Sequence, residues 1–229
     1  MKADLTILTA TIGRPNLNRL IESIDSQTWC GKFLHILLWD DYRLENSLTP
    51  EHFNSEKRYN IITRSGGKNP GASPAGRVYG LGIMSAYTPW ITMADDDVWW
   101  EPNHLEQLFI ALENKKWAST LRTVWSPTNL NCIGVDRFES VGDDPTKRVD
   151  YEMCDSNTMI FKRELGVYAS PAFRETLQYD GDRLLYSFFK QHGGQRGRTG
   201  TPTINQYCPN HLERFFWNNC DKTTDFHVI

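Results

Sequence analysis

Apolar runs and amphipathic segments alternate along the first half of the chain. The runs Leu5–Thr11, Phe33–Trp39 and Trp90–Ala94 are rich in apolar and β-branched residues, which is typical of strands buried on both faces of a sheet. After the first run, apolar residues follow the i, i+3, i+4, i+7 spacing of an amphipathic helix: Leu17, Leu20, Ile21 and Ile24. This pattern predicts a strand, a helix and a second strand in succession.

The same alternation continues beyond the second run. A short strand is predicted at Tyr59–Thr63 and a helix at Val78–Tyr87. A further helix follows Pro102, where the apolar positions again have helical spacing: Leu105, Leu108, Phe109 and Leu112. Strand and helix signals in alternation favour an α/β fold with a mainly parallel central sheet and helices on both faces.

The second half of the chain is less regular. Strands are predicted at Trp117–Trp125 and Asn131–Val135, and Ser156–Leu165 begins as a strand and turns helical. A helix is predicted at Asp180–Gly193, with four apolar side chains facing inward: Leu184, Leu185, Phe188 and Phe189. The basic, glycine-rich segment Gly193–Thr203 is expected to be a mobile loop. No repeat or linker stands out, so residues 1–229 are expected to form a single domain.

Bulk composition narrows the class of protein. The chain has 229 residues, of which 39% are hydrophobic and 23% charged, which is ordinary for a globular protein with one core. The formal net charge is −3. A chain with this balance is not built to coat nucleic acid or an anionic membrane.

The cysteine content favours a reducing compartment. There are five cysteines, an odd number, and no two of them have the C-x-x-C spacing of a zinc or redox site. Reduced thiols in a cytosol are the simplest interpretation, so we expect a cytoplasmic protein. The N-terminus lacks the long apolar stretch of a signal peptide, and no segment approaches the ~20 apolar residues of a membrane span. We therefore expect no transmembrane segment.

Three adjacent aspartates, Asp95, Asp96 and Asp97, follow the run Trp90–Ala94. In an extended chain alternate side chains share a face, so Asp95 and Asp97 are expected to face one site and Asp96 to face away. Two carboxylates on one side suit Mg²⁺ or Mn²⁺, which bind oxygen ligands and usually retain waters. The alternative is a solvated acidic loop or a charge cluster at a helix N-terminus.

The place of these aspartates in the chain favours the metal site. In open α/β sheets, ligands bind beyond the carboxyl ends of the strands. Three polar clusters fall at such ends: Thr9–Arg14, Asp40–Asp41 and Asp95–Asp97. Their agreement indicates a ligand site at this edge of the predicted sheet.

Four stretches of sequence resemble a known family. They read TATIGRPNLNRLIESIDSQTW, LLWDD, NPGASPAGRVYGL and ADDDVWWEPNHLE. In this order they resemble the GT-A nucleotide-sugar glycosyltransferases, most closely family two, over about residues 4–113. The resemblance implies a GT-A fold. It also implies that residues 1–115 bind the nucleotide sugar and metal, and that residues 116–229 bind the acceptor.

The resemblance further implies a role for each matching residue. The segment after the first strand would hold the nucleotide. Asp41, with Asp40 as the weaker candidate, would accept hydrogen bonds from the base or ribose, and Arg77 would approach the donor phosphates. Asp96 would lie near the donor ribose or sugar. The implied donor-binding set is Thr9, Thr11, Arg14, Asp41, Arg77 and Asp96, and the implied ligands of Mn²⁺ or Mg²⁺ are Asp95 and Asp97.

The implied activity is metal-dependent, inverting transfer of a sugar from a nucleotide-diphosphate sugar, a UDP-sugar being favoured, to an acceptor hydroxyl. The hydroxyl must lose its proton as it attacks, so a carboxylate base is needed opposite the leaving group. The family pattern E-D-x-x-L at a helix start is matched by GDRLL, which makes Asp182 the candidate base and Asp180 the second choice. Either residue could instead cap that helix. Asp155 is a weaker candidate, for acceptor binding.

Several other residues have both a structural and a functional interpretation. Trp100 matches a tryptophan of the family, and packing is favoured over sugar stacking because large aromatic side chains are mostly buried. His211 or His227 could join the metal site, as a late histidine does in some GT-A enzymes, although a lone histidine is usually structural. Arg196 and Arg198 could close over the diphosphate as a lid or belong to a solvated loop.

Two other functions are weighed against glycosyl transfer. A sugar nucleotidyltransferase has a related layout but a glycine-rich loop with a lysine after the first strand, whereas TATIGRP has one glycine. A non-catalytic sugar- or protein-binding module on the same scaffold is the other alternative. The expected acceptor is a glycan or another hydroxyl-bearing molecule. A DNA acceptor is possible but not favoured, because the one basic stretch is Lys190–Arg198.

Overall fold

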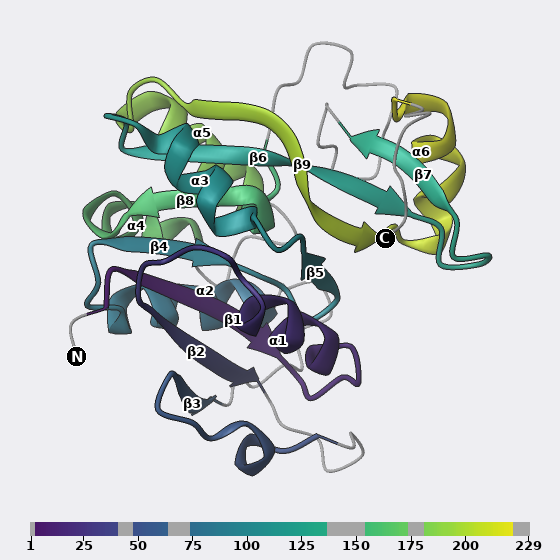
Figure 1. Cartoon of the computed structure of the whole chain (residues 1–229). Coiled ribbons are helices and arrows are strands. Elements are labelled where there is room, and N and C mark those ends of the chain that lie inside the picture. Colours follow the sequence, from purple (N-terminus) through teal and green to yellow (C-terminus); the bar gives the residue numbers. More distant parts are fainter. Residues whose placement is uncertain (1–2, 41–47, 64–73, 137–153, 174–180, 222–229) are drawn as a thin grey trace.

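One sheet runs through the molecule (Figure 1). The computed structural model describes residues 3–40, 48–63, 74–136, 154–173 and 181–221. Within these ranges the sheet has nine strands in the order β3-β2-β1-β4-β8-β6-β9-β5, with β7 paired to β6. Segments from both halves of the chain are therefore joined edge to edge in the same sheet.

Strands β1 to β4 form a parallel block. β1 pairs in parallel with β2 and β4, and β2 pairs in parallel with β3. Their bounds are Leu5–Thr11, Phe33–Asp40, Arg58–Thr63 and Trp90–Met93. Every residue of β1 is buried, as the apolar run predicted. Since parallel strands end at the same edge, the polar clusters after β1, β2 and β4 are brought to one side of the block.

The remaining strands extend the block with mostly antiparallel pairings. β8 is antiparallel to both β4 and β6, β7 is antiparallel to β6, β9 is parallel to β6, and β5 is antiparallel to β9. Their bounds are Val98–Trp100 for β5, Trp117–Trp125 for β6, Cys132–Asp136 for β7, Met159–Lys162 for β8 and Gly197–Tyr207 for β9. β8 is the strand that connects the parallel block to β6 and β9.

Helices cover both faces of the sheet, as predicted. α1 and α3 pack on one face, and α2, α4 and α5 pack on the other, while α6 packs against β7. The bounds are Leu17–Asp25, Pro74–Ser85, His104–Leu112, Arg163–Ala169, Gly181–His192 and Glu213–Asn219 for α1 to α6. None of the helices in the described ranges is long and apolar enough to cross a membrane.

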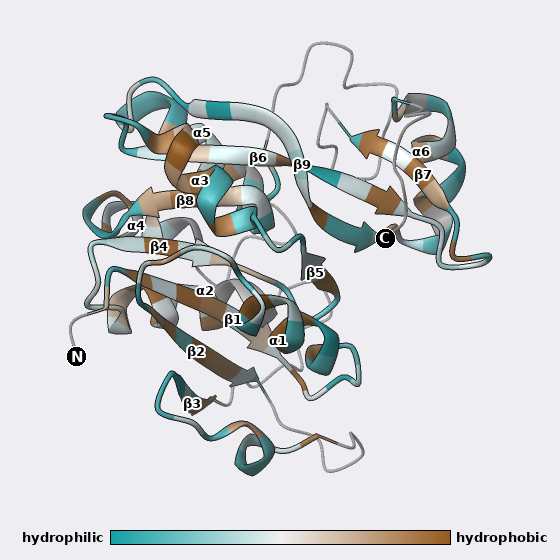
Figure 2. Ribbon diagram, viewed as in Figure 1, coloured by the Kyte–Doolittle hydropathy of each residue, from teal (hydrophilic) through white to brown (hydrophobic). Residues whose placement is uncertain are grey.

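Side chains that alternate along β1 contribute to two hydrophobic cores, one on each face of the sheet. Leu5 and Ile7 pack with α1 and α3, whereas Leu8 and Ala10 pack with α2. The four apolar positions that predicted α1 are all buried: Leu17, Leu20, Ile21 and Ile24. Figure 2 shows the result, with brown strands at the centre and teal residues on the outer surfaces of the helices.

One expectation about local structure was wrong, and one strand was missed. The segment Gly193–Thr203 was expected to be a mobile loop, but most of it belongs to β9, between β6 and β5. One glycine of this segment, Gly197, is needed for packing. A Cβ atom there would lie 1.9 Å from the carbonyl oxygen of Ala111, so only glycine allows β9 to approach α3 this closely. β5 was not predicted, because Val98–Trp100 is too short to show a period.

The close approach at Gly197 gives a first prediction. We expect Gly197→Ala to lower the free energy of unfolding by more than about 3 kcal/mol, because backbone atoms of α3 must move. The control is Gly194→Ala, where φ is +74° and no atom lies within 4 Å of the added Cβ. Its cost should be about 1–2 kcal/mol, from the left-handed backbone alone. Urea unfolding measures both, and equal losses would contradict the packing assigned to β9.

Candidate active site

The three aspartates lie in a turn between β4 and β5. Asp96 and Asp97 have turn geometry, and the N–H of Val98 donates to the carbonyl oxygen of Asp95 at 3.3 Å. The expectation of an extended segment with alternating side chains was therefore wrong. Asp96 and Asp95 do face different partners, but this follows from the turn and not from the alternation of side chains in a strand.

Both carboxylate oxygens of Asp95 accept hydrogen bonds from buried side chains. The Tyr79 hydroxyl donates to Oδ1 at 2.7 Å, and the Asn157 amide donates to Oδ2 at 2.9 Å. Burial raises the pKa of Asp95, and the charges of Asp155 and Asp96 raise it further, against the effect of the two donors. Burial and the neighbouring Asp95 also raise the pKa of Tyr79 well above its ordinary value, so this hydroxyl keeps its proton.

Asp96 binds two residues that follow or end β1. Its Oδ2 accepts from the Thr11 hydroxyl at 2.7 Å, and its Oδ1 accepts from the Arg14 guanidinium at 3.2 Å. Burial raises the pKa of Asp96, and these two partners oppose the rise. The structure thus brings the predicted residues Thr11 and Arg14 to the three aspartates.

Asp97 is the aspartate with an unsatisfied oxygen. Its Oδ1 is buried and has no hydrogen-bond partner among the described residues, and Arg14 is 3.9 Å from Oδ2. Burial raises the pKa of Asp97 to about 7, and the charges of Asp95 and Asp96 contribute. A buried oxygen without a donor, beside another carboxylate, is what a divalent cation would satisfy.

The described residues alone do not complete a metal site. Within the described ranges, no group of three or more His, Cys, Asp or Glu side chains could hold a metal ion together. Asp95 and Asp97 could supply two oxygen ligands to Mn²⁺ or Mg²⁺, with the other positions filled by water and substrate oxygens, as these ions prefer. The donor set therefore fits an ion that binds together with a diphosphate.

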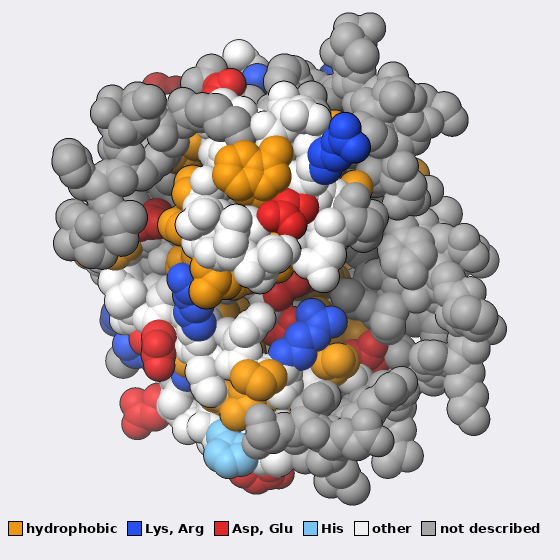
Figure 3. All heavy atoms as spheres, turned by 90° about the vertical axis from the view of Figure 1, so that its right-hand side faces the viewer, with side chains coloured by type: hydrophobic (Ala, Val, Ile, Leu, Met, Phe, Trp, Pro, Cys, Tyr) orange, Lys and Arg blue, Asp and Glu red, His pale blue; other side chains and the backbone are white. Residues whose placement is uncertain are grey.

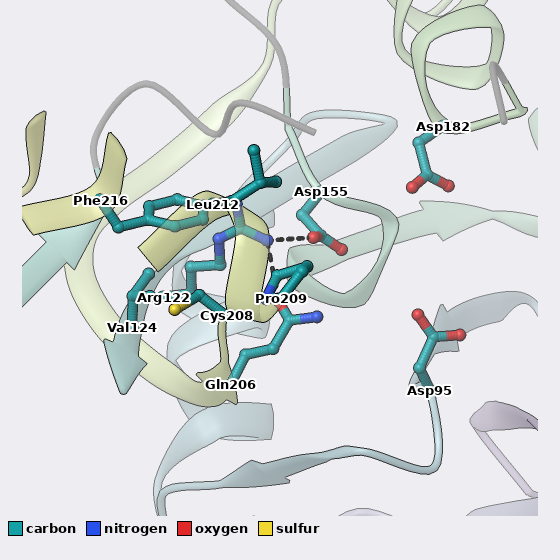
Figure 4. Close-up of a pocket in the computed structure, with 10 residues that line it drawn as sticks. All are labelled: Asp95, Arg122, Val124, Asp155, Asp182, Gln206, Cys208, Pro209, Leu212 and Phe216. Atoms are coloured by element: carbon teal, nitrogen blue, oxygen red, sulfur yellow. Dashed lines mark hydrogen bonds and ion pairs between the residues drawn. The ribbon is translucent and has the colours of Figure 1, made fainter. Parts of the chain in front are cut away.

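A cavity of about 120 Å³ opens beside Asp95. Three carboxylates line it, those of Asp95, Asp155 and Asp182, and the opposite wall is largely apolar. Figure 4 shows Asp182, at the start of α5, and Asp95, after β4, pointing their carboxylates toward one another. Burial raises the pKa of Asp182 to about 7, with the charges of Asp155 and Asp95 contributing and Ser156 and Arg122 opposing. The structure thus places Asp182, the predicted base, at the same cavity as Asp95.

A buried arginine forms one wall of the cavity. Arg122 of β6 is 3% exposed. Its guanidinium donates to Asp136 at 2.7 and 3.0 Å, to Gln206 at 2.8 Å, and to Asp155. The sequence analysis did not identify Arg122, Asp136, Asn157 or Tyr79. The sequence did offer a signal for Arg122, because this arginine lies within the predicted strand Trp117–Trp125. A charged side chain in a buried strand needs a partner of opposite charge.

Other predicted residues lie elsewhere or outside the described ranges. Thr9 is completely buried, and its hydroxyl lies 3.0 Å from Nε2 of His35, so it does not face the aspartates. Side chains outside the described part are those of Asp41, Arg77, Asp180, His211 and His227. Trp100 is 3% exposed and packs on His104, which supports its structural interpretation.

The arginines near the start of β9 do not form a lid. Arg196 lies over the rings of Trp117 and Tyr186, at 5.9 and 5.6 Å from the ring centroids. Arg198 belongs to β9 and pairs with Ser119 of β6. Of the two interpretations given to these arginines, a lid or a solvated loop, neither describes Arg198, which is held in the sheet. On the face shown in Figure 3, acidic side chains instead lie recessed beside basic ones.

Comparison with known proteins shows the fold. No protein-family profile matches the sequence, and no curated protein sequence matches it. Among solved structures, S. aureus TarS 1–349 superposes with a TM-score of 0.67 at 12% identity, over 90% of this chain and 60% of that one. The complex of TarS 1–349 with UDP-GlcNAc superposes with a TM-score of 0.65 at 11% identity, over 91% of this chain and 59% of that one. The complex with UDP superposes with a TM-score of 0.64 at 13% identity, over 94% of this chain and 62% of that one. The chain spans about 60% of TarS 1–349. It has the GT-A glycosyltransferase fold.

The Arg122 ion pairs give a second prediction. Arg122→Met leaves Asp136 and Asp155 buried without their shared cation, so we expect a loss of about 3–5 kcal/mol in the free energy of unfolding. Arg14→Met is the control, because the Arg14 side chain is 51% exposed. Its ion pair with Asp96 should contribute less than about 1 kcal/mol. Chemical denaturation of both variants tests this, and losses of similar size would refute the assignment.

Asp182 gives a third prediction, on the pH dependence of stability. Its pKa is about 7 in the folded protein, against an ordinary value of 3.8. The folded state therefore binds this proton more tightly, and the resulting stability is lost as the pH rises toward 7. Asp182→Asn removes the effect, so its melting temperature should exceed that of the wild type by about 2–4 °C at pH 8. The difference should shrink toward pH 4, and a constant difference in thermal unfolding scans would contradict the raised pKa.

Proposed function

We propose that this protein transfers a sugar from a nucleotide-diphosphate sugar to an acceptor hydroxyl, with inversion at the transferred carbon. The observation that carries the proposal is the facing pair of carboxylates, Asp95 on the nucleotide side and Asp182 across the cavity. The GT-A fold supports the general class. The carboxylate pair supports a reaction in which donor and acceptor meet between the two halves of the chain.

The donor would bind at the carboxyl ends of β1 and β4. This is where ligands of open α/β sheets bind, and here Thr11 and Arg14 meet the three aspartates. Mn²⁺ or Mg²⁺, held by Asp95 and Asp97, would neutralise charge on the departing diphosphate. The neighbouring TarS structures contain UDP and UDP-GlcNAc, which favours a uridine donor. Asp41 and Arg77 are proposed from the family resemblance to contact the nucleoside and the phosphates.

Asp182 would act as the general base. As the acceptor oxygen bonds to the sugar carbon, the bond from that carbon to the diphosphate oxygen breaks, and the hydroxyl proton passes to the Asp182 carboxylate. A pKa of about 7 places this group near the range in which a base works best at neutral pH. Attack from the side opposite the diphosphate inverts the configuration.

The acceptor would enter through the cavity beyond Asp182. Its lining combines the polar side chains of Arg122 and Gln206 with an apolar wall: Val124, Cys208, Pro209, Leu212 and Phe216. All of these residues belong to the second half of the chain, which the family resemblance assigns to acceptor binding. A glycan or another hydroxyl-bearing molecule suits this mixed lining. DNA is less favoured, since three carboxylates line the same cavity.

Calorimetric titration with UDP, with and without Mn²⁺, tests the donor half of the proposal. We expect Mn²⁺ to strengthen UDP binding to the wild type by at least ~10-fold, because a cation held by Asp95 and Asp97 would offset the negative charge of the diphosphate. Asp97→Asn should abolish this gain. Asp182→Asn is the matched control: it removes a carboxylate on the acceptor side and should retain Mn²⁺-dependent UDP binding.

Three outcomes decide between the alternatives. UDP binding of equal strength with and without Mn²⁺ would refute the metal site. Binding of a nucleoside triphosphate and a sugar phosphate, with formation of the nucleotide sugar, would favour a sugar nucleotidyltransferase. If neither UDP nor other nucleoside diphosphates bind, the chain is a non-catalytic module on this fold.

A further inference from the structure

Asp95 is held from two sides by residues that the proposed reaction has not used. Tyr79, on α2, binds one carboxylate oxygen at 2.7 Å, and Asn157 binds the other at 2.9 Å. Asn157 belongs to a short 3₁₀ turn, η3 (Ser156–Thr158), directly before β8. The two donors thus come from different elements, Tyr79 from a helix that covers the sheet and Asn157 from the turn beside the end of β4.

Asn157 is fixed in one orientation by its own partners. Its Nδ2 donates to Asp95 and to Asp155, the latter at 2.8 Å, while its Oδ1 accepts from the backbone N–H of Asp95. An amide turned by 180° would place its oxygen between two carboxylates. The side chain is 2% exposed, so water does not compete for these bonds.

Asp155 anchors Asn157 in turn. The backbone N–H of Asn157 donates to Asp155 at 2.9 Å, and the other oxygen of Asp155 accepts from buried Arg122. A continuous chain of hydrogen bonds therefore runs from Arg122 on β6, through Asp155 and Asn157, to Asp95 after β4. Breaking any link would leave a buried polar group without its partner.

The strand register explains why these residues meet. In the antiparallel pair of β4 and β8, Trp90 is opposite Lys162 and Thr92 is opposite Ile160. Continuing this register past the end of β4 places Asp95 opposite Asn157. The contact thus follows from sheet pairing, although the two residues are 62 positions apart.

The contacts leave Asp95 able to bind a further ligand. Each carboxylate oxygen has two lone pairs, and Tyr79 and Asn157 together use one on each oxygen. The remaining lone pairs are aimed in fixed directions, because rotation of the carboxylate would break both bonds. Partners of this kind orient metal ligands, and their loss typically weakens metal binding about 10–100-fold.

We propose that Asn157 and Tyr79 are positioning residues that clamp the Asp95 carboxylate in the orientation required by a divalent cation bound with the donor diphosphate. This inference rests on the proposed function, and it adds to it the residues that preorganise the site before the substrate arrives. Asn157 also connects the clamp to Arg122, which lines the acceptor cavity.

The test uses Asn157→Leu, Tyr79→Phe and the double variant. Mn²⁺ is titrated into each protein with UDP at saturation, and UDP is also titrated without metal. We expect each single variant to bind Mn²⁺ about 10–100-fold more weakly, with little change in metal-free UDP affinity. In the double variant, the fold-loss of Mn²⁺ affinity should be smaller than the product of the two single fold-losses. Either single change already allows the Asp95 carboxylate to rotate, so the second change adds less.

Thr158→Val is the matched control for a merely structural effect. Thr158 is buried in the same turn, but its hydroxyl donates to the backbone oxygen of Asp155 at 2.8 Å rather than to a carboxylate. Its Mn²⁺ affinity should stay within about two-fold of the wild type. If Asn157→Leu does not fold, Tyr79→Phe, which removes one hydroxyl, still tests the clamp.

The outcomes separate the clamp from the proposed function. Wild-type protein that binds Mn²⁺ with UDP, together with variants that bind it equally well, would overturn the clamp alone. An equal loss in Thr158→Val would overturn it as well. Wild-type protein that shows no Mn²⁺-dependent UDP binding would overturn both the clamp and the metal-dependent transferase.

Discussion

Repulsion among clustered, partly buried carboxylates is the constraint on which the site depends. Five of them converge at the junction of the parallel block with β6: Asp95, Asp96, Asp97, Asp155 and Asp182. Burial raises the pKa values of Asp95, Asp96, Asp97 and Asp182, and repulsion by neighbouring carboxylates raises those of Asp95, Asp97 and Asp182 further. The charged forms of these groups are therefore disfavoured in the folded protein. Such a cluster opposes folding unless cations and hydrogen-bond donors offset the repulsion.

The protein offsets this repulsion unequally. Asp155 has buried Arg122, and Asp96 has Thr11 and Arg14, so both are satisfied internally. Asp95 has only neutral donors, and Asp97 keeps an oxygen without a hydrogen-bond partner among the described residues. The residual negative charge is therefore concentrated where the diphosphate is proposed to bind. A cation there would relieve repulsion that the fold itself leaves in place.

Much of the fold could be predicted from the sequence because local periodicity reports burial. The bounds of β1 and β6 were predicted to the residue, and the apolar face of α1 was predicted completely. The acidic turn was found because three adjacent aspartates stand at the end of an apolar run, and Asp182 was proposed from the family resemblance. Periodicity cannot report partners across the sheet, however. Arg122 and Asp155 are 33 positions apart, and Tyr79 reaches Asp95 across 16. Glycine content was also misleading at Gly197, where it allows close packing and not mobility.

Asn157, one of the residues that sequence reasoning missed, was missed for a topological reason. The rule that ligands bind at the carboxyl ends of strands directs attention to residues that follow parallel strands. An antiparallel strand inserted beside them brings the residues that precede it to the same edge. β8 is such a strand, and Asp155 and Asn157 stand just before it, opposite the end of β4. In a mixed sheet, the polar residues before an antiparallel strand therefore belong to the search for a site as much as those after a parallel one. Here that search would have led from Asp95 to Asn157, and from there to Arg122.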